Sequence, residues 1–461
     1  MNINDTLQYQ NIGLPEDILR RKQWGDFEGA LHLIDRRLSD PEITESLAHC
    51  LRVHREMIRL LPQEYPYTRE DALNIIRNKI PDFTEEEFDE LVDDRRIYWI
   101  YVKGEMRFFN RFFSSVCKAI PAFAKRAGVQ LPGVESATGG TTEDGRLDIT
   151  MRRMKAAGKL TNRIRIRATV KLKDEFFTPG MFIRAHLPIP SACQQQSDIR
   201  IEKVYPSHGI ASPVDAPQRT VCWEEFVTEN HEFEVVYSYL HTAEFKDAYH
   251  GSGIPGEYDF DLQEQAPHIV FTPYIRALCE ELTRGLTDPL AKARAFYDYI
   301  TLQMKYTFMP SYILLDNIVE NCARNLTGDC GVFALTFITL CRCAGIPAQW
   351  QSGLTAEPDF IGGHDWVRFF VEPFGWIYAD PSYGTGAVRL GKEERRQFYF
   401  GNLDPYRMVA NSAFQQNFTI PKEHWRADPY DNQLGEMETG DRGFSFNDYI
   451  RTKEILTCEE V

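Results

Sequence analysis

The segment from Leu326 to Ala348 constrains the fold more than any other stretch of the chain. After Cys330 it is apolar nearly all round, which is the pattern of a helix buried on every side. Thr327 or Asp329 can cap the start of this helix, and Gly345 is a residue type that ends helices. The sequence therefore predicts a buried helix with Cys330 in its first turn.

A cysteine in the first turn of a buried helix is a candidate nucleophile. Unpaired backbone N–H groups and the positive end of the helix dipole lie there, and both stabilise a thiolate. The backbone N–H of Cys330 could also donate to an oxyanion. Position alone leaves a structural role for Cys330 equally open. Cys341 and Cys343 lie deeper in the helix and are predicted to pack in the core.

A predicted hairpin downstream supplies a histidine and an aspartate. A strand over 362–372 is followed by a turn at 373–375 and by a returning strand that ends at Asp380. This turn would place His364 nearly opposite Asp380, with a bulge or longer loop because the turn lies past the midpoint. Their even separation lets both side chains share a face. We expect Cys330 to attack a carbonyl, His364 to act as the base and Asp380 to orient the histidine.

The motifs GDCGVFA, AGIPA, GGHDWVRFF and GWIYADPSYG resemble, in their order and spacing, the core of the transglutaminase-like superfamily. The resemblance covers about residues 290 to 390. It implies a papain-like catalytic triad of Cys330, His364 and Asp380. It also points to Tyr306 as a donor to the oxyanion, with a plain core aromatic as the alternative.

Three further features bear on this resemblance. Trp366 matches a family aromatic with a packing role, whereas Asp365 stands where the family often has a small residue. The superfamily often carries a β-sandwich N-terminal to its catalytic domain, which agrees with a β-rich segment in this chain. The region lacks a loop of closely spaced carboxylates, which disfavours calcium-regulated crosslinking.

A chain of 461 residues is long enough for several domains. Its patterns predict a multidomain α+β fold, with a linker between Pro132 and Thr142. The expected parts are a helical domain over 1–132, a β-sandwich-like module over 143–246, a papain/transglutaminase-like α+β catalytic core over 260–400, and a C-terminal extension over 401–461 that packs on the other domains.

Within the helical domain, Thr68 and Thr84 are predicted N-caps, and Pro41 is placed at a helix start. The β-rich stretches on either side of Lys103-Gly104 predict a hairpin. The domain could therefore contain a winged-helix-like unit, although such units also serve as protein-contact modules.

The β-rich segment is read as strands over about 145–246. Residues 163–173 alternate basic and apolar side chains, which predicts a half-buried strand. Its basic face could bind an anion or could simply face solvent at an outer surface. Alternating residues in the extension predict further strands over 443–446 and 449–451.

A net charge of −15 disfavours binding to nucleic acid or to an anionic membrane. No run of 18 apolar residues occurs, and the first residues lack the apolar core of a signal peptide. The ten cysteines form no CxxC pair, so we expect reduced thiols in a cytoplasmic protein, with no metal and no cofactor.

The sequence favours a cysteine-dependent amide or peptide hydrolase that acts on a protein or peptide through a thioester. A protein-glutamine acyltransferase with an amine acceptor uses the same residues and stays open. A non-catalytic scaffold or binding protein is a third alternative, against which the intact triad argues. The absence of paired CxxC motifs weakens a deglycosylase of the N-glycanase type. The substrate and the oligomeric state are not predicted.

Overall fold

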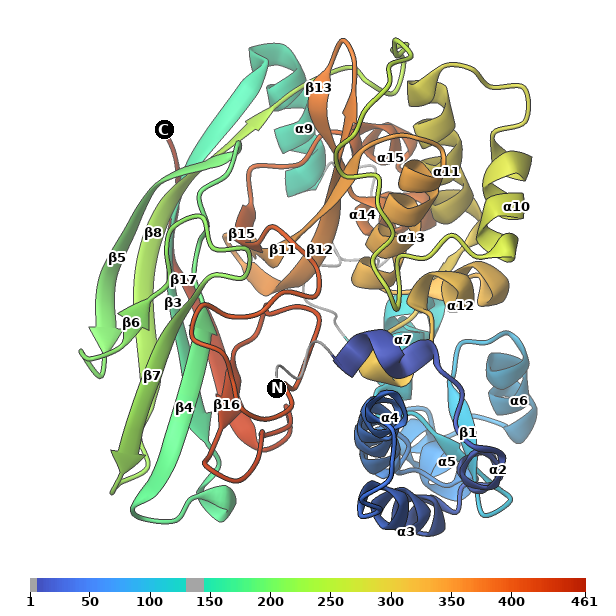
Figure 1. The fold of residues 1–461 in the computed structure, drawn as a ribbon. Helices are drawn as coiled ribbons and strands as arrows, with labels where there is room; N and C mark the ends of the chain where they lie inside the picture. The colour runs from blue at the N-terminus through green and yellow to red at the C-terminus, as the bar shows by residue number, and fades with distance from the viewer. Residues whose placement is uncertain (1–5, 130–144) are drawn as a thin grey trace. The chain divides into compact units, whose positions relative to one another are not determined.

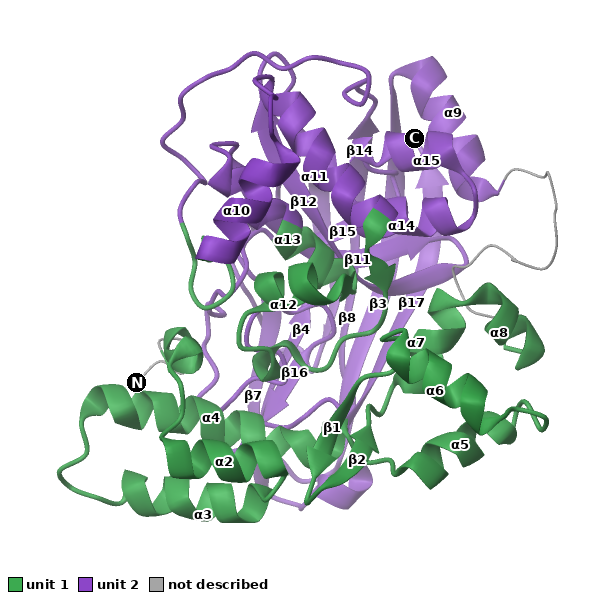
Figure 2. Cartoon of the chain, turned by 90° about the vertical axis from the view of Figure 1, so that its right-hand side faces the viewer, with its two compact units in different colours: residues 1–142, 264–272, 303–336 green, residues 143–263, 273–302, 337–461 purple. Residues whose placement is uncertain are grey.

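The computed structural model describes residues 6–129 and 145–461 and has a multidomain α+β fold. The predicted linker from Pro132 to Thr142 lies outside the described residues. Figure 2 colours two compact units. Unit 1 consists of residues 1–142, 264–272 and 303–336, and unit 2 of residues 143–263, 273–302 and 337–461. The division passes through one helix, α13 (Cys330–Cys343), after Thr336.

The first part of unit 1 is helical with one hairpin, as the sequence predicts. Its elements are η1 (Gln8–Asn11), α2 (Glu16–Trp24), α3 (Phe27–Leu38), α4 (Glu45–Glu64), α5 (Arg69–Arg77), α6 (Glu85–Asp93), β1 (Trp99–Val102), β2 (Glu105–Phe108), α7 (Phe112–Ala119) and α8 (Pro121–Arg126). Both predicted threonine caps are confirmed, since Thr68 and Thr84 each form a capping box. The predicted start at Pro41 is wrong. Helix α4 begins at Glu45, because the Thr44 side chain caps it by accepting from Leu47 N.

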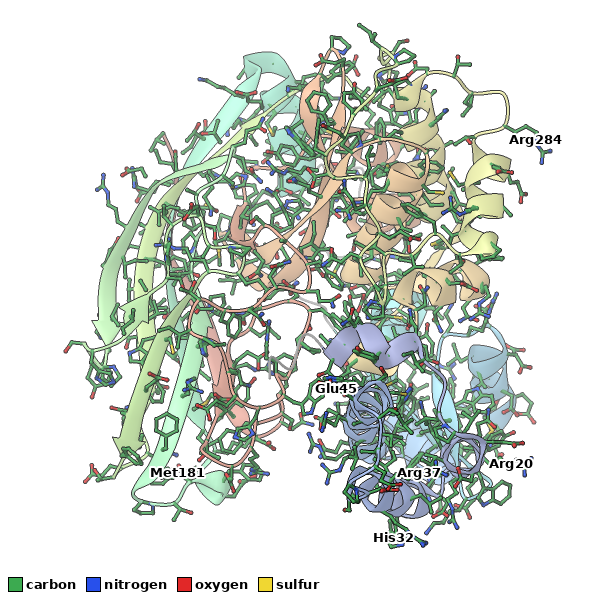
Figure 3. The ribbon with its side chains drawn as sticks, viewed as in Figure 1. Arg20, His32, Arg37, Glu45, Met181 and Arg284 are labelled. Carbon is green, nitrogen blue, oxygen red and sulfur yellow. The ribbon has the colours of Figure 1, made fainter. Side chains whose placement is uncertain are left out.

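One hydrophobic core holds these helices together. The side chains at its centre include Ile34, Ile58, Phe88 and Phe112, all almost fully buried. The aromatic pair of Phe88 and Phe108 packs edge to face at 5.0 Å. At the surface, Arg37 of α3 donates to Asp17 of α2 at 2.8 Å, and Figure 3 labels Arg37.

The remainder of unit 1 leads into the buried helix. It consists of β9 (Lys305–Tyr306), η3 (Tyr312–Leu314), α12 (Ile318–Asn325), β10 (Thr327–Gly328) and the first half of α13. Strands β9 and β10 pair in parallel, with Tyr306 level with Gly328. Phe308 and Leu314 pack against the core of the N-terminal helices. The segment before Cys330 is therefore built on the helical domain.

Unit 2 contains two four-stranded sheets that share one core, which confirms the predicted sandwich. The sheet orders are β16-β4-β7-β6 and β17-β3-β8-β5. Their strands are β3 (Lys159–Leu172), β4 (Met181–Pro188), β5 (Gln196–Tyr205), β6 (Ile210–Ala211), β7 (Thr220–Val227), β8 (Phe233–Glu244), β16 (Glu436–Glu438) and β17 (Tyr449–Glu460), with the short helix η2 (Asp174–Phe176) between β3 and β4. Figure 1 shows β16 and β17, from the end of the chain, beside β4 and β3.

Two predictions for this region are wrong. Residues 146–157 form a helix, α9 (Arg146–Ala157), and not a strand, because Leu147, Met151 and Met154 recur at helical spacing and bury one face. Residues 443–446 form no strand, and only an isolated bridge joins Gly443 to Glu438. Strand β17 is correspondingly longer than its predicted range of 449–451.

The basic face of β3 is an outer face lined by ion pairs. Arg165 donates to Glu202 of β5 at 2.6 Å. Arg167 lies 3.2 Å from Glu234 of β8, and Arg163 pairs with Asp198. Acidic partners on β8 and on β5, the strand beyond it, therefore occupy the guanidinium groups for which the sequence left anion binding open.

A five-stranded sheet and its helices make up the rest of unit 2. The sheet order is β14-β13-β12-β11-β15. The elements are α10 (Pro273–Leu282), α11 (Pro289–Gln303), β11 (Ala348–Glu357), β12 (Phe360–Val371), β13 (Gly375–Ala379), α14 (Pro381–Arg389), α15 (Glu393–Phe398), β14 (Phe400–Gly401) and β15 (Arg407–Asn411). Leu354 of β11 and Met408 of β15 join the sandwich core, while Phe337 of α13 packs on Phe369 of β12 at 5.4 Å. The residues after 400 thus add strands to all three sheets.

Candidate active site

Cys330 is the first residue of α13 and is half-buried. Asp329 caps this helix, because its Oδ1 accepts from Val332 N at 3.3 Å. Tyr312 Oη and Met309 N also donate to the Asp329 carboxyl, at 2.5 and 3.3 Å. Burial raises the pKa of Asp329 despite these hydrogen bonds. The helix start that carries Cys330 is therefore held by a half-buried cap that accepts three hydrogen bonds.

The other predicted cap, Thr327, has a different partner. Its Oγ1 lies 2.6 Å from Tyr98 Oη. Between the two, Gly328 allows a close approach, since a Cβ there would lie 2.7 Å from Val332 and 2.9 Å from Phe333. A larger residue at 328 would displace the first turn of α13.

Tyr306, which the sequence proposes as oxyanion donor, lies level with Gly328, two residues before Cys330. Its side chain is buried, and its Oη accepts from Lys118 Nζ at 3.1 Å. Its ring also packs against Phe333 of α13 at 6.2 Å. The oxyanion role stays a prediction.

His364 and Asp380 lie together within unit 2. His364 Nε2 is 2.8 Å from Asp380 Oδ2, and both side chains are buried. The predicted register that would put them opposite each other is wrong. Strands β12 and β13 pair without a bulge, with Val367 opposite Ala379, so Asp380 is level with Trp366 instead. The contact forms because diagonal neighbours on one face of a sheet remain within reach of long side chains.

Asp380 is the N-cap of α14 as well as the partner of His364. Its Oδ1 accepts from Tyr383 N at 2.8 Å, and its Oδ2 accepts from Arg407 Nη1 at 2.8 Å. Burial alone would raise the pKa of this carboxyl. The charges of His364 and Arg407 and the cap hydrogen bond outweigh burial and lower it. Asp380 is therefore held as a carboxylate that faces one nitrogen of His364.

Arg407 and Asp404 are the members of this cluster that the sequence did not identify. Both are almost fully buried, and the Asp404 carboxylate accepts from Arg407 at 2.6 and 3.0 Å. Asp404 also accepts from Tyr399 Oη at 3.0 Å. The cation lowers the pKa of Asp404 against the effect of burial. The only signal in the sequence was Asp-Pro-Tyr-Arg at the head of a strand pattern, inside the segment assigned to the extension.

Tyr383 and Glu357 extend the cluster on the other side of His364. The Tyr383 ring lies 4.9 Å from the His364 ring, and the Arg407 guanidinium is 4.3 Å from the Tyr383 ring centre. Tyr383 Oη donates to Glu357 at 3.3 Å. Burial, aided by the nearby charge of Asp404, raises the pKa of Glu357 to about 7. A carboxyl with a pKa of about 7 is therefore hydrogen-bonded to the Tyr383 side chain, whose ring is tilted by 58° against that of His364.

None of the ten cysteines, all of which lie in the described residues, forms a disulfide. Cys341 is fully buried, which confirms its predicted packing role, and burial raises the pKa of its thiol well above the usual value. Cys343 is half-buried and forms a hydrogen bond with Cys279 of α10. Burial likewise raises the pKa of Cys117 and Cys193 to about 11. Such thiols are poor nucleophiles at neutral pH.

In residues 6–129 and 145–461, no group of three or more His, Cys, Asp or Glu side chains could hold a metal ion. None of the helices in the same ranges combines the length and apolarity required to cross a bilayer.

Comparisons with known proteins identify part of the chain. Residues 276–381 match the profile of the transglutaminase-like superfamily. The uncharacterised protein YebA of Bacillus subtilis (strain 168) is 24% identical over 129 residues, which is 24% of this chain and 17% of YebA. The chain therefore spans about one sixth of the length of that relative.

Two solved structures share 15% sequence identity with the chain. One is a candidate cysteine protease from Cytophaga hutchinsonii, with a TM-score of 0.43 over 66% of this chain and 91% of that chain. The other is the periplasmic domain of TgpA from Pseudomonas aeruginosa, with a TM-score of 0.27 over 57% of this chain and 100% of that chain. The family profile covers Cys330, His364 and Asp380 together.

Proposed function

Because residues 276–381 form a transglutaminase-like core, we propose that the protein is a cysteine-dependent hydrolase of amide or peptide bonds in a protein or peptide. In this proposal Cys330 is the nucleophile, His364 the base and Asp380 the residue that orients His364. The observation that carries the proposal is the buried hydrogen bond of 2.8 Å between His364 Nε2 and Asp380 Oδ2. This bond engages Nε2, so Nδ1 is the ring nitrogen that exchanges a proton with the thiol.

The reaction proceeds through a thioester. The Cys330 thiolate attacks the substrate carbonyl, so that a C–S bond forms and the C–N bond breaks, and His364 gives its proton to the departing amine. A water molecule then gives a proton to His364 and attacks the thioester. A C–O bond forms, the C–S bond breaks, and the carboxylic acid leaves while the proton on His364 restores the ion pair with the thiolate. The net change is addition of one water molecule across the amide bond.

The charges around His364 support the protonated state that this reaction needs. Asp380 and Asp404 carry two negative charges and Arg407 one positive charge, which leaves one negative charge for an imidazolium to balance. All three side chains are almost fully buried, so solvent screens them weakly. The cluster thus favours an imidazolium at His364 and a thiolate at Cys330.

In this proposal two groups donate to the oxyanion. One is the backbone N–H of Cys330 at the start of α13, where hydrogen-bond donors lack partners within the helix. The other is the hydroxyl of Tyr306, whose oxygen accepts from Lys118 Nζ. A cationic donor to this oxygen draws electron density from it and makes the Tyr306 O–H a stronger donor.

Selective alkylation tests the nucleophile and the base. Iodoacetamide at pH 6 should modify Cys330 faster than the other nine cysteines, because only a thiol held as thiolate reacts rapidly at that pH. His364→Ala should abolish the selectivity. Cys330→Ser should remove the fast-reacting site without changing the slow labelling of the rest. Equal rates at all ten cysteines, measured by mass spectrometry of peptides, would favour the scaffold reading instead.

A second measurement separates hydrolysis from acyl transfer. The protein is incubated with casein and a fluorescent primary amine, and both new amino termini and incorporated amine are counted. The proposal predicts new amino termini, none in Cys330→Ala, and no incorporated amine above the level of that variant. Incorporation that depends on Cys330 would identify an acyltransferase.

We also propose a cytoplasmic location. Cys279 and Cys343 contact each other as thiols, an arrangement that suits a reducing compartment. Alkylation of the protein freshly taken from cells, before any reductant is added, should then modify both residues. Recovery of a disulfide between them would contradict the proposal.

A further inference from the structure

Arg111 is an exposed cation beside the segment that leads to Cys330. It is the N-cap residue of α7, and its guanidinium carbon lies 3.9 Å from the ring centre of Phe308. Phe308 is itself held on α7, because its backbone N donates to Ser115 Oγ at 3.1 Å. The stacked ring therefore fixes where the charge of Arg111 lies.

The segment under Arg111 is hydrogen-bonded to the residues that precede the nucleophile. Thr307 N donates to Gly328 O at 2.9 Å, and Met309 N donates to Asp329 Oδ2 at 3.3 Å. The charge of Arg111 is close enough to lower the pKa of Asp329, although burial dominates and raises it. Asp329 is the neighbour of Cys330 in the chain, so Arg111 lies within electrostatic range of the helix start.

The guanidinium of Arg111 has no acceptor among the described residues. No carboxylate of residues 6–129 or 145–461 forms an ion pair or hydrogen bond with it. By contrast, Arg96 before the hairpin and Arg107 within β2 pair with Asp94 and Glu105 at 2.9 and 3.1 Å. A guanidinium carries five N–H donors. Those of Arg111 are directed to solvent or to a ligand.

Neutralising two half-buried carboxyls nearby, Asp329 and Glu64, would be a purely structural role for Arg111. Burial raises the pKa of both Asp329 and Glu64, and the charge of Arg111 opposes this rise. Each carboxyl is already hydrogen-bonded by other groups, Asp329 by three donors and Glu64 by the backbone and hydroxyl of Ser311. The structural role leaves the donors of Arg111 unused.

Lys118 is a second cation on the same side of this segment as Arg111. Lys118 of α7 lies 4.4 Å from the ring centre of Tyr306 and 5.0 Å from that of Phe308. Helix α7 and its N-cap residue therefore place two positive charges against Tyr306 and Phe308, at and just after the end of β9. In a protein of net charge −15, an anionic ligand needs such a local cation to approach.

We propose that Arg111 determines specificity by binding a carboxylate of an acidic peptide substrate close to the acyl group that Cys330 attacks. This inference rests on the proposed function, since it assumes that Cys330 is the nucleophile. A planar guanidinium matches a carboxylate with two parallel hydrogen bonds, and the Phe308 ring holds it in place. Arg111 thereby adds a charge preference to a reaction that the triad performs on any acyl group.

Two alkylating reagents of nearly equal size test the charge preference. Iodoacetate and iodoacetamide both form a C–S bond with the thiolate and release iodide, and they differ in one negative charge. The ratio of their rates at Cys330 should fall roughly fivefold in Arg111→Met, as expected for the loss of one partly screened charge. The rate with iodoacetamide should change less than twofold. Raising the salt concentration to about 0.5 M should lower the ratio in the unaltered protein but not in the variant.

Two further variants control the measurement. Arg36→Met removes an equally exposed charge from α3, which Figure 2 shows at the opposite end of unit 1 from α13, and should leave the ratio unchanged. Arg111→Lys retains the charge and should retain most of the ratio, which covers the case in which Arg111→Met does not fold.

The outcomes separate this inference from the proposed function. If Cys330 is not labelled selectively by either reagent, the proposed function fails. If labelling is selective but the ratio is the same in Arg111→Met, or both rates fall equally, then Arg111 is structural and this inference is overturned. A check with substrate compares two peptides that differ only in having Asp or Asn at one position. The unaltered protein should have the lower KM for the Asp peptide, and Arg111→Met should have the same KM for both.

Discussion

The hydrogen-bonding capacity of the Asp380 carboxylate is shared among three partners. His364 and Arg407 bind Oδ2, and the backbone of Tyr383 binds Oδ1. A carboxylate so engaged cannot rotate, and it therefore fixes the ring orientation of His364 as well as its charge. Local sequence could suggest Asp380 as the partner of His364, but not the third partner from a distant strand.

Asp380→Asn should lower the rate of Cys330 alkylation by iodoacetamide at pH 6 by about tenfold or more. The amide keeps the size of the side chain but no longer stabilises an imidazolium, so less thiolate is present below the ordinary pKa of a thiol. Asp198→Asn, which removes an exposed carboxylate paired with Arg163, serves as the matched control. Equal rates in Asp380→Asn and the unaltered protein would show that Asp380 does not act through His364.

Glu357 should make stability depend on pH in a direction opposite to that of Asp380. Its pKa is raised to about 7 in the folded protein, against about 4.3 when unfolded. Between these values the folded state holds a proton that the unfolded state loses, so the contribution of Glu357 to stability falls as the pH rises through this window. In Glu357→Gln this loss is absent. The variant should gain up to roughly 3 kcal/mol relative to the unaltered protein between pH 4.5 and 8.

Urea unfolding at several pH values measures this difference. Glu280→Gln on α10 is the control, because Glu280 is exposed and lacks the buried surroundings of Glu357. A difference between Glu357→Gln and the unaltered protein that stays constant across pH would show that Glu357 does not hold a proton in the folded state.

At the scale of elements, two short pieces of secondary structure complete the His364 cluster. Helix α14 begins at the residue after Asp380, which makes this residue a cap and a partner of His364 at once. Strand β15 begins with Arg407 and pairs with β11, so it delivers the cation from the segment beyond the family match. The site therefore depends on an element that the sequence assigned to the extension.

Arg407→Met should destabilise the protein by about 3–5 kcal/mol, because it leaves Asp380 and Asp404 buried without their shared cation. Adding Asp404→Asn removes one of the two carboxylates and should recover a large part of this loss. The alkylation rate of Cys330 should stay low in the double variant, since Asp380 still lacks the hydrogen bond from Arg407. Denaturant unfolding and iodoacetamide kinetics on the same samples measure the two effects separately. If the double variant recovers both the free energy of unfolding and the alkylation rate, Arg407 has a purely structural role.

At the scale of the whole molecule, each of the two units has its own hydrophobic core. Phe112 belongs to the core of the helical domain in unit 1, and Val235 to the sandwich core of unit 2. Proteins with several domains often unfold in more than one step, because each core loses its packing separately. The residues proposed for catalysis come from both units.

Core substitutions should therefore act locally. Phe112→Leu should lower the protection of unit 1 amides from hydrogen exchange by about 1–3 kcal/mol and leave those of unit 2 unchanged. Val235→Ala should do the reverse. Hydrogen exchange followed by mass spectrometry of peptides reports both units in one experiment. If each substitution lowers protection evenly throughout the chain, the two units unfold as one.

The sequence alone determined those features that depend on residues close together in the chain. Capping residues identified the starts of α5, α6 and α13, because a cap acts on backbone groups only two or three residues away. An alternating pattern identified β3 for a similar reason, since side-chain direction repeats every two residues. The motifs around Cys330 and His364 identified the candidate chemistry and the family of residues 276–381.

Only the tertiary structure decided the rest. Helix α9 is an exception, because Leu147, Met151 and Met154 recur at helical spacing in the sequence, and it was missed because residues 145–246 were assigned as a whole to a β-rich segment. The diagonal register that joins His364 to Asp380, and the arrival of Arg407 and Asp404 beside them, depend on strand pairing between residues far apart in the chain. Such pairing is selected by the packing of whole faces, and no local pattern carries it. Cys330 was therefore predictable as the start of a helix, whereas the buried charges that govern His364 were not.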